Sequence, residues 1–275
     1  MKLEIYIPKD INKDQALLSV THLAVAAHQD DIEIMAYDGI IKCFGKADKN
    51  FAGVVVTDGG GSSRSGIYAD YTDEQMKLIR KIEQRKAAVI GDYNAQFFLD
   101  YKSSDAKNPT NVDIIADLKE ILQKTQPDYI YTHNLADKHD THVGVAIKLI
   151  RALRELDYQP KGLYGCEVWR NLDWMMDNDK VKFDVTGHGN LEAALLGVFD
   201  SQIAGGKRYD LATAGRRIAN ATYSESHNVD TATSLMFAMD LTPLTADKNL
   251  EIKEFVLSHI NNFANDVNNK LEGLI

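Results

Sequence analysis

The sequence predicts an α/β protein with a Rossmann-like three-layer sandwich, in which a mostly parallel sheet lies between helices and the C-terminal part is elaborated. From His22 to about Gly165, short β-branched or aromatic runs alternate with longer segments of helical period, which is the pattern of βαβ units. The 275 residues, 44% of them hydrophobic, suffice for one sizeable core. No repeat or proline-rich linker divides the chain, so we expect a single domain over 1–275, with a core at about 20–170 and an elaboration at about 171–275.

Five runs in the alternating region have the length and composition of buried strands. Each is rich in β-branched or aromatic residues, and polar or helical segments separate one from the next. The predicted strands are 22–28, 51–58, 94–101, 127–134 and 161–169.

Helices connect these strands. The sequence TDEQ, which begins at Thr72, resembles a capping box, and Gly91 stands where a C-cap glycine is expected. Apolar residues at a three-residue step between them predict the buried face: Met76, Ile79 and Ile82. The face of the next helix is formed by Ile114, Ile115, Leu118, Ile121 and Leu122. A third helix is expected to begin right after His142, with apolar residues Val143, Ile147, Ile150 and Leu153.

The pattern is weaker beyond residue 170 but still predicts an order of elements. The expected elements are a strand at 181–187, helices at about 190–203 and 209–221, a strand near 234–244 and an amphipathic helix at about 249–271.

The composition argues against several classes of protein. A formal net charge of −9 disfavours nucleic-acid binding, which relies on clustered lysine and arginine. No run approaches the roughly 18 apolar residues of a membrane span, and the N-terminus shows no signal-peptide pattern. We therefore expect a cytoplasmic protein with neither nucleic acid nor membrane as partner, and the sequence leaves a homo-oligomer open. Cys43 and Cys166 lack metal-type spacing and are expected to be buried, reduced thiols.

Metal-ligand residue types follow two of the predicted strands. The first strand ends in HQDD (28–31), and the fourth continues into HNLADKHDTH (133–142). In parallel sheets of this kind the first and fourth strands flank the crevice where chain direction reverses, and binding sites form at the carboxyl ends of those strands. We therefore expect the two clusters to meet across one crevice.

The residues in this crevice suit a catalytic metal. His28 and Asp31 could converge if a helix starts near Asp31, and His142 could complete a set of two histidines and one carboxylate, which is typical of catalytic zinc. Asp30 would then be free to accept a proton from water activated by the metal. His139 could stabilise an oxyanion or protonate a leaving amine.

The same residues resemble two motifs of a known family. AHQDDIE looks like the A-H-P-D-D-E motif, and HDTH like the H-x-D-H motif, of the zinc-dependent PIG-L/LmbE-like deacetylases, which remove N-acetyl groups, commonly from N-acetylglucosamine moieties. The likeness covers roughly residues 20 to 170 and includes IRKIEQRKAAVIGDY, which is similar to the family's R-x-x-E helix. The resemblance implies a Rossmann-like sheet and Zn²⁺ bound by His28, Asp31 and His142, although Fe²⁺ or cobalt could occupy these ligands. It also implies Asp30 as general base and His139 as the group that assists the tetrahedral intermediate.

The motifs depart from the family pattern at two positions. Gln29 replaces the usual proline, which removes no ligand. Thr141 stands where the second motif has an aspartate that is thought to orient the neighbouring histidine. The sequence leaves open which carboxylate replaces it, and the candidates are Asp113, Asp137 and Asp140.

Other residues have a functional and a structural interpretation. Arg64, in the loop 58–66, could contact a sugar hydroxyl or an anionic group, or the loop could simply be a flexible part of the surface. Arg80 could reach the substrate pocket, or form an exposed intrahelical pair with Glu83. Either tryptophan, Trp169 or Trp174, could stack on a sugar, although buried anchors are commoner. Four histidines are interpreted as structural or surface residues rather than ligands: His22, His133, His188 and His259.

These observations favour a zinc-dependent hydrolase that removes an N-acetyl group from a small amino-sugar substrate. The alternative is a metal-containing sugar- or metabolite-binding protein with lost or altered catalysis, which the threonine at position 141 motivates. Nucleotide binding is a weak third hypothesis, because acidic residues occupy the turn where a pyrophosphate needs glycines and amide groups.

Overall fold

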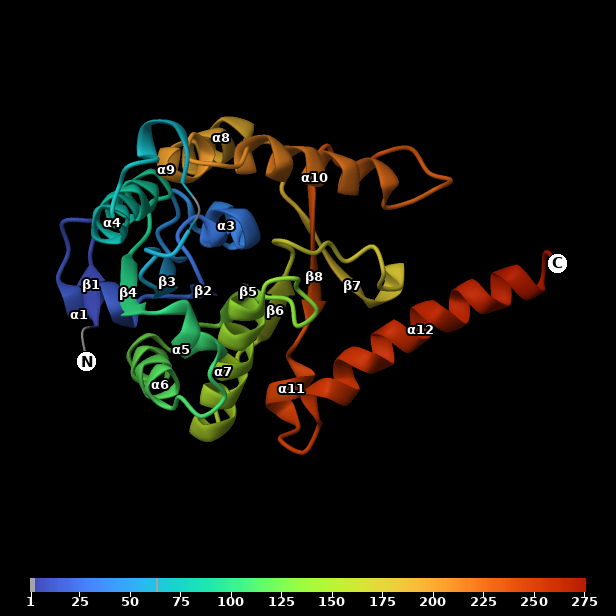
Figure 1. The fold of residues 1–275 in the computed structure, drawn as a ribbon. Helices are drawn as coiled ribbons and strands as arrows, with labels where there is room; N and C mark the ends of the chain where they lie inside the picture. Colours follow the sequence, from blue (N-terminus) through green and yellow to red (C-terminus); the bar gives the residue numbers. More distant parts are fainter. Residues whose placement is uncertain (1–2, 63) are drawn as a thin grey trace.

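A computed structural model describes residues 3–62 and 64–275 and contains a mixed sheet of eight strands with helices on both faces (Figure 1). The strand order is β1-β4-β3-β2-β5-β6-β8-β7. The five central strands run parallel, and both edges are completed by antiparallel strands. The predicted α/β class with a mostly parallel sheet is confirmed.

All five strands predicted for the core form the parallel part of the sheet. They are β2 (His22–Ala26), β3 (Phe51–Thr57), β4 (Ala95–Tyr101), β5 (Tyr129–His133) and β6 (Gly162–Cys166). Residues in β2 and β3 are buried on both faces, which explains why these strands are almost continuously apolar rather than alternating.

The antiparallel edges come from both ends of the chain. The two strands predicted beyond residue 170 are β7 (Lys180–Asp184) and β8 (Leu235–Asp240), and β8 lies between β6 and β7. β1 (Glu4–Tyr6) pairs with β4 at the other edge. Its three residues are too few to show a periodicity, so the sequence analysis missed this strand.

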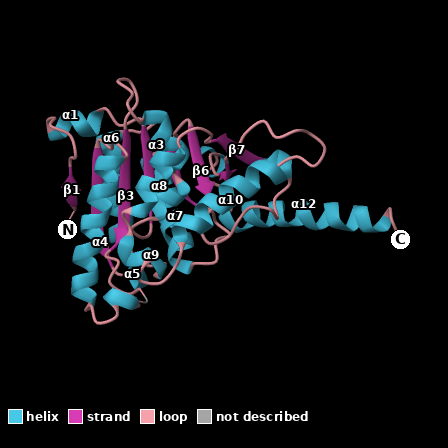
Figure 2. Cartoon of the chain, turned by 90° about the horizontal axis from the view of Figure 1, so that it is seen from above, coloured by secondary structure: helices cyan, strands magenta, loops and turns pink. Residues whose placement is uncertain are grey.

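Helices cover the two faces of the sheet and enclose two separate cores (Figures 1 and 2). One core is covered by α1 (Lys13–Leu18), α5 (Ser103–Lys107), α6 (Asp113–Thr125), α7 (Asp140–Leu156) and α11 (Pro243–Ala246). The other is covered by α2 (Asp31–Met35), α3 (Tyr37–Cys43), α4 (Asp73–Ile90) and α8 (Gly189–Gly197). Strand β2 shows the separation directly, because Leu23 and Val25 enter the first core, whereas Ala24 and Ala26 enter the second.

Several predicted boundaries were wrong. The strands predicted to reach residues 169 and 187 end at Cys166 and Asp184. Helix α7 begins at Asp140 rather than after His142, because His139 caps the helix by accepting a hydrogen bond from the Thr141 N–H. The helix predicted at 190–203 is divided into α8 and the short α9 (Asp200–Ile203), since the backbone leaves helical geometry at Phe199. The strand predicted to reach residue 244 ends at Asp240, because Pro243 starts α11.

The buried face of α4 also differs from the prediction. Its capping box at Thr72 and its end at Gly91 are as expected, but Ile82 is 49% exposed. Three polar residues, Arg80, Glu83 and Gln84, are buried instead. Apolar spacing misidentified the face because this helix packs its polar residues beside the candidate site.

The last helices lie at one side of the molecule. Helix α10 (Tyr209–Tyr223) packs on β8 and α8, and α12 (Ile252–Glu272) extends away from the body of the protein (Figure 1). Among the described residues, no helix combines the length and the apolar character that crossing a membrane requires.

Gly144 provides a test of how closely α7, the helix that carries His142, packs on its neighbour. A Cβ atom at Gly144 would lie 2.4 Å from the Ala106 carbonyl oxygen of α5. Because this oxygen belongs to the backbone, it cannot move away without disturbing α5. We expect Gly144→Ala to lower the free energy of unfolding by about 1–3 kcal/mol, as overpacking does. Urea denaturation measures the change.

Gly215 supplies the matched control, because it lies inside α10 and no atom would contact its added Cβ within 4 Å. Gly215→Ala should raise the free energy of unfolding by about 0.5–1 kcal/mol through helix propensity alone. Equal effects of the two substitutions would contradict the close contact at Gly144.

Candidate active site

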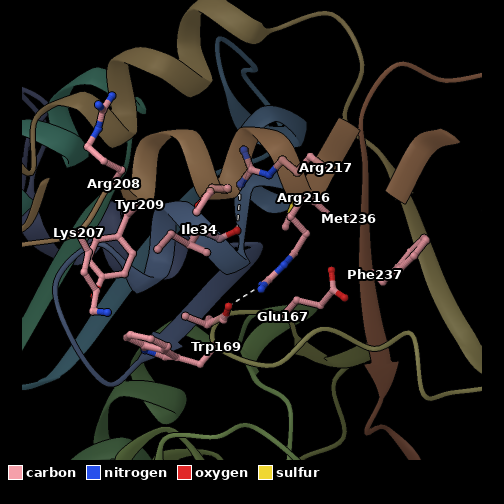
Figure 3. Close-up of a pocket in the computed structure, with 13 residues that line it drawn as sticks. Ile34, Glu167, Trp169, Lys207, Arg208, Tyr209, Arg216, Arg217, Met236 and Phe237 are labelled. Carbon is pink, nitrogen blue, oxygen red and sulfur yellow. Dashed lines mark hydrogen bonds between the residues drawn. The ribbon is translucent and has the colours of Figure 1, made fainter. Parts of the chain in front are cut away.

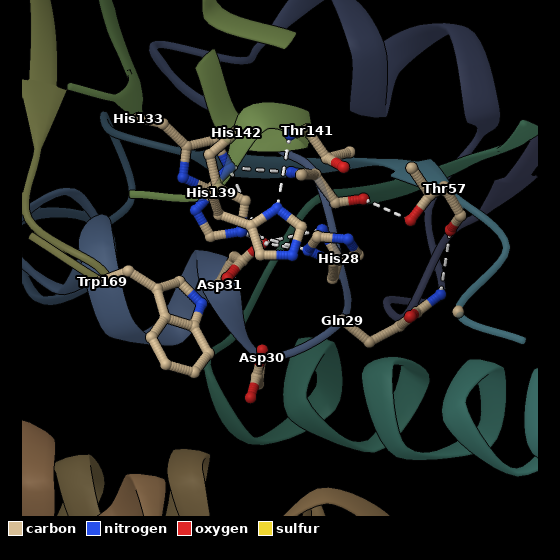
Figure 4. Close-up of polar contacts among 12 residues, drawn as sticks. His28, Gln29, Asp30, Asp31, Thr57, His133, His139, Thr141, His142 and Trp169 are labelled. Carbon is tan, nitrogen blue, oxygen red and sulfur yellow. Dashed lines mark hydrogen bonds and ion pairs between the residues drawn. The ribbon is translucent and has the colours of Figure 1, made fainter. Parts of the chain in front are cut away.

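The carboxyl ends of β2 and β5 lie side by side, as the strand order requires. Residues 22–24 of β2 pair in parallel with residues 129–131 of β5. The chain proceeds from β2 towards β3 and β4 on one side, and from β5 towards β6 on the other, so β2 and β5 flank the switch point of the sheet. The segments 28–31 and 133–142 therefore converge at one edge (Figure 4).

Three side chains from these segments direct one atom each to a common point. The His28 Nδ1 and Asp31 Oδ2 atoms are 3.2 Å apart, His28 Nδ1 and His142 Nε2 are 3.1 Å apart, and His142 Nε2 and Asp31 Oδ2 are 3.3 Å apart. Ligands at about 2.0–2.1 Å from a tetrahedral zinc ion are separated by about 3.3–3.4 Å. The three atoms therefore have the spacing of one face of such a coordination sphere.

The Asp31 carboxylate is buried in the middle of this cluster. Its Oδ2 atom accepts a hydrogen bond from the backbone N–H of His28 at 2.7 Å. Burial acts to raise the pKa of Asp31, but the imidazoles of His142, His133 and His28 outweigh it and hold the pKa below its usual value. Asp31 thus stays ionised, as a metal ligand must.

A second carboxylate lies behind His142. The Asp137 Oδ1 atom lies 3.6 Å from His142 Nδ1, while the backbone N–H groups of His139 and Trp169 donate to Asp137 at 2.9 and 3.0 Å. Burial acts to lower the pKa of His142, but Asp31 and Asp137 outweigh it and raise that pKa. A proton held on Nδ1 leaves the Nε2 lone pair directed at the cluster, which is the usual arrangement behind a metal-binding histidine.

None of the three candidate carboxylates is paired with His139. Asp137 is beside His142, and Asp113 and Asp140 are exposed at the starts of their helices. The Nδ1 atom of His139 instead accepts the Thr141 N–H at 3.3 Å. Burial, followed by the nearby His142 and His28, lowers the pKa of His139. The imidazole is therefore neutral, with its proton on Nε2.

Asp30 lies next to the cluster with its carboxyl group turned away from Asp31 (Figure 4). It adopts a left-handed conformation, with φ of 85°, at the start of α2. Its Oδ2 atom is buried without a hydrogen-bond partner in the described part of the chain. Burial and then the charge of Asp31 raise the pKa of Asp30 well above its usual value, while Arg80 opposes them.

The glutamate of the first motif is also buried. Glu33 Oε1 accepts hydrogen bonds from Gln84 Nε2 and the Tyr93 hydroxyl, both at 2.8 Å. Burial raises the pKa of Glu33 to about 8 despite these two donors. Glu33 therefore supports α2 from behind, as a largely protonated acid at neutral pH.

His133 is the cluster member that the sequence analysis set aside. It is fully buried, its ring stacks on His142 at 3.9 Å, and its Nε2 atom accepts the Ala27 N–H at 2.9 Å. The Ala27 N–H occupies that lone pair, and His133 also belongs, with Asp31 and His142, to a group whose ligand atoms lie close enough to hold a metal ion. Its position could have been found from the sequence, since it ends β5 just as the first motif follows β2.

Of the two arginines suggested for substrate binding, Arg64 lies on the loop after β3, and Arg80 lies in α4 and bonds to that loop. The Arg64 side chain folds back onto its own loop and bonds Asp73, Tyr71 O and Gly60 O. Arg80 is 2% exposed and donates to Gly59 O at 2.7 Å. The prediction that Arg80 and Glu83 form an exposed intrahelical pair is wrong, because both side chains are buried.

Glu83, in helix α4, connects this helix to the C-terminal part of the chain. It is buried and accepts hydrogen bonds from the Ser201 N–H at 2.8 Å and from the Ser201 hydroxyl at 2.6 Å. The next residue, Gln202, donates to the Gln29 carbonyl oxygen. Residues beyond 170 thus help to form this site, although the core motifs lie before that position.

A cavity of about 330 Å³ adjoins the cluster (Figure 3). Trp169 lines it, and its ring lies 6.5 Å from that of His139. Trp174 packs against the core instead. The two tryptophans therefore differ: Trp169 is available for stacking on a sugar, whereas Trp174 is an anchor of the core.

The sequence comparison finds a match to one family. A family model described as PIG-L, GlcNAc-PI de-N-acetylase, matches residues 23–153, which include both motifs and the helix between them. The resemblance seen in the motifs is therefore confirmed for this part of the chain. No protein of curated function matches the sequence significantly.

Solved structures share the fold. N,N'-diacetylchitobiose deacetylase from Pyrococcus horikoshii is 16% identical, with a TM-score of 0.64 over 85% of this chain and 88% of that chain. 4-Carboxy-2-hydroxymuconate hydratase from Pseudomonas putida is 18% identical, with a TM-score of 0.62 over 81% and 96%. The antimicrobial A40926 pseudoaglycone deacetylase is 13% identical, with a TM-score of 0.55 over 81% and 97%. At these identities the likeness establishes the fold alone.

Glu33 gives the metal-free site a testable pH dependence. Folded Glu33 keeps its proton up to about pH 8, whereas the unfolded residue ionises near the ordinary value of 4.5, so the stability of the fold falls as pH rises through this window. Glu33→Gln removes that loss. Between about pH 5 and pH 8 the variant should gain on the order of 4 kcal/mol relative to the parent protein.

Urea denaturation in the presence of a chelator measures this difference. Exposed Glu254 provides the control substitution, Glu254→Gln, which should follow the pH dependence of the parent protein. A constant difference between the Glu33→Gln variant and the parent protein across this range would contradict a protonated Glu33.

Proposed function

We propose that this protein is a metal-dependent N-deacetylase, a hydrolase that removes the acetyl group from a small N-acetylated amino sugar of the N-acetylglucosamine type. The observation that carries the proposal is the triangle of donor atoms from His28, Asp31 and His142, with edges of 3.1 to 3.3 Å. The match of residues 23–153 to a de-N-acetylase family model supports the reaction type.

The donor set would hold one divalent transition-metal ion. Two imidazole nitrogens and one carboxylate oxygen suit Zn²⁺, and Fe²⁺ is accepted by the same ligand types. When bound, such an ion acidifies water and polarises a carbonyl oxygen. The buried, ionised Asp31 would balance part of the charge of the ion.

Asp30 would act as the general base. The Oδ2 atom of its buried carboxyl has no hydrogen-bond partner among the described residues, so this oxygen is free to receive a proton from the attacking water. A raised pKa suits a group that later returns the proton to the leaving amine, because both transfers then occur near neutral pH.

His139 would bind the oxyanion of the tetrahedral intermediate. Since the Thr141 N–H occupies Nδ1, the Nε2–H of His139 is the donor that remains. Trp169, beside it, would stack on the sugar ring. A neutral imidazole would be a weaker donor than the imidazolium that a neighbouring aspartate favours.

The threonine at position 141, where the family motif has an aspartate, favours a second candidate function. This candidate is a sugar- or metabolite-binding protein with lost or altered catalysis. Thr141 is buried, its hydroxyl has no hydrogen-bond partner, and no carboxylate is bonded to the His139 imidazole in the described part of the chain. The fold alone does not specify the reaction either, because the structure of a hydratase shares it. Saturable binding of N-acetylglucosamine without acetate release would favour this candidate.

The ligand set predicts the metal content. Protein purified without chelator should contain about one divalent ion per chain, and His28→Ala, Asp31→Ala and His142→Ala should each deplete it. Plasma emission spectrometry on the purified variants measures the occupancy.

His133→Gln is the matched control, because an amide can replace the acceptor for the Ala27 N–H without supplying an imidazole. This variant should keep its metal. Full occupancy in all three alanine variants, or depletion in His133→Gln alone, would show that the ligand assignment is wrong.

The general base predicts a kinetic effect without metal loss. Asp30→Asn should lower kcat for acetate release from N-acetylglucosamine derivatives by at least about a hundredfold, which is the usual scale for a positioned base. Metal content measured on the same sample serves as the control. An Asp30→Asn enzyme with unchanged kcat would mean that another group takes the proton.

A further inference from the structure

The cavity beside the candidate site has apolar walls and a position that suits a substrate. It lies between the segment after β6, the start of α10 and strand β8 (Figure 3). Its apolar lining consists of Ile34, Val168, Ala212, Met236 and Phe237. A volume of about 330 Å³ is within the range of small-molecule sites, which are about 300–1,000 Å³.

Two aromatic residues belong both to this cavity and to the candidate site. Trp169 donates its backbone N–H to Asp137, the carboxylate behind His142. Tyr209 packs edge-on against Trp169 at 6.1 Å. Burial, followed by the charges of Asp30 and Asp31, raises the pKa of Tyr209. A ligand held between these rings would reach from the cavity to the reacting centre.

Two cations face this apolar space. Arg216 extends from α10 and donates one N–H to the Val168 carbonyl oxygen, which leaves further N–H groups of its guanidinium at the cavity (Figure 3). Lys207 Nζ lies 5.1 Å from the centre of the Trp169 ring. Neither cation forms an ion pair within residues 3–62 and 64–275.

The other two arginines of this segment already have acidic partners. Arg208 also lines the cavity, but its guanidinium binds Asp210 through two hydrogen bonds of 3.0 and 2.7 Å. Arg217 pairs with Glu192 at 2.7 Å. Unsatisfied positive charge is therefore concentrated on Lys207 and Arg216, although the protein as a whole carries a net charge of −9.

One acidic side chain lines the same wall, and its oxygens are already occupied. Glu167 accepts the Leu172 N–H at 2.7 Å and the Asn220 amide at 2.9 Å. Burial raises the pKa of Glu167, with Arg216 opposing this effect. Glu167 thus acts as part of the wall and leaves the outer N–H groups of Arg216 available.

We propose, on the basis of the deacetylase function proposed above, that this cavity binds the part of the substrate beyond the amino sugar and that this part carries an anionic group. Arg216 would bind a carboxylate or phosphate through its paired N–H groups, and Lys207 would supply the second positive charge. Cations with apolar surroundings gain most from such a partner, since little water competes. Trp169 would hold the sugar ring between the anion and the reacting amide.

Three N-acetylglucosaminides with matched sugars test this inference on the metal-loaded protein. They carry a neutral methyl group, a carboxymethyl group or a phosphate at the anomeric position. Calorimetry should show at least about tenfold tighter binding of one anionic ligand than of the methyl glycoside. A concentration of 0.5 M NaCl should reduce this preference, because salt screens the attraction between charges that solvent reaches. The carboxymethyl and phosphate ligands distinguish the two anions.

Variants assign the preference to the two cations. Arg216→Gln and Lys207→Met should each reduce it to about threefold or less, while Arg216→Lys should retain part of it by keeping the charge. Arg208→Gln is the control, because the Arg208 guanidinium is already paired with Asp210, and this variant should keep the full preference. Lys207 is exposed, so its substitution remains informative if the Arg216 variants are unstable.

The outcomes separate this inference from the proposed function. Equal affinity for the three ligands, or a preference that survives in both Arg216→Gln and Lys207→Met, would overturn the anionic subsite even if acetate is released from all three. Charge-dependent binding without acetate release would support the subsite and contradict the deacetylase.

Discussion

The structure of the candidate site depends on a buried carboxylate, Asp31, which is surrounded by imidazoles at the switch point of a parallel sheet. Strands β2 and β5 are neighbours, so the first motif and the second motif end at the same edge. Asp31 accepts the His28 N–H and lies within 3.6 Å of the ring nitrogens of three histidines. A negative charge at this depth needs positive partners, and the histidines supply only part of that charge at neutral pH.

The neighbouring acids make the local charge balance more demanding. Asp30, Asp31 and Glu33 are all buried within four positions of the chain. Burial raises the pKa values of Asp30 and Glu33, while Asp31 is held ionised. Such an arrangement costs stability without a cation, and it is better explained by a site that binds a divalent ion than by the needs of the fold. The roles proposed for Asp31 as an ionised ligand and for Asp30 as a proton acceptor rest on these different surroundings.

The elaborated C-terminal part completes the site rather than forming a separate unit. Ser201 and Gln202 bond to Glu83 and to the Gln29 backbone, so α9 holds both α4 and the first motif in position. Helix α10 supplies the cavity residues Tyr209 and Arg216. The core motifs thus determine where chemistry would occur, while the later helices shape what reaches it.

Much of the fold and the composition of the site could be predicted from the sequence. Hydrophobic periodicity located the five parallel strands and the helices between them, because the free energy of burying apolar groups sums over a whole element and leaves a regular pattern. The strand order then placed 28–31 beside 133–142.

Only the tertiary structure decided how individual polar groups pair. Asp137 lies behind His142 rather than His139, His133 binds the Ala27 N–H, and α4 buries Arg80 and Glu83 instead of Ile82. These pairings join residues distant in the chain, and they depend on side-chain positions to within about an ångström, which local periodicity does not record.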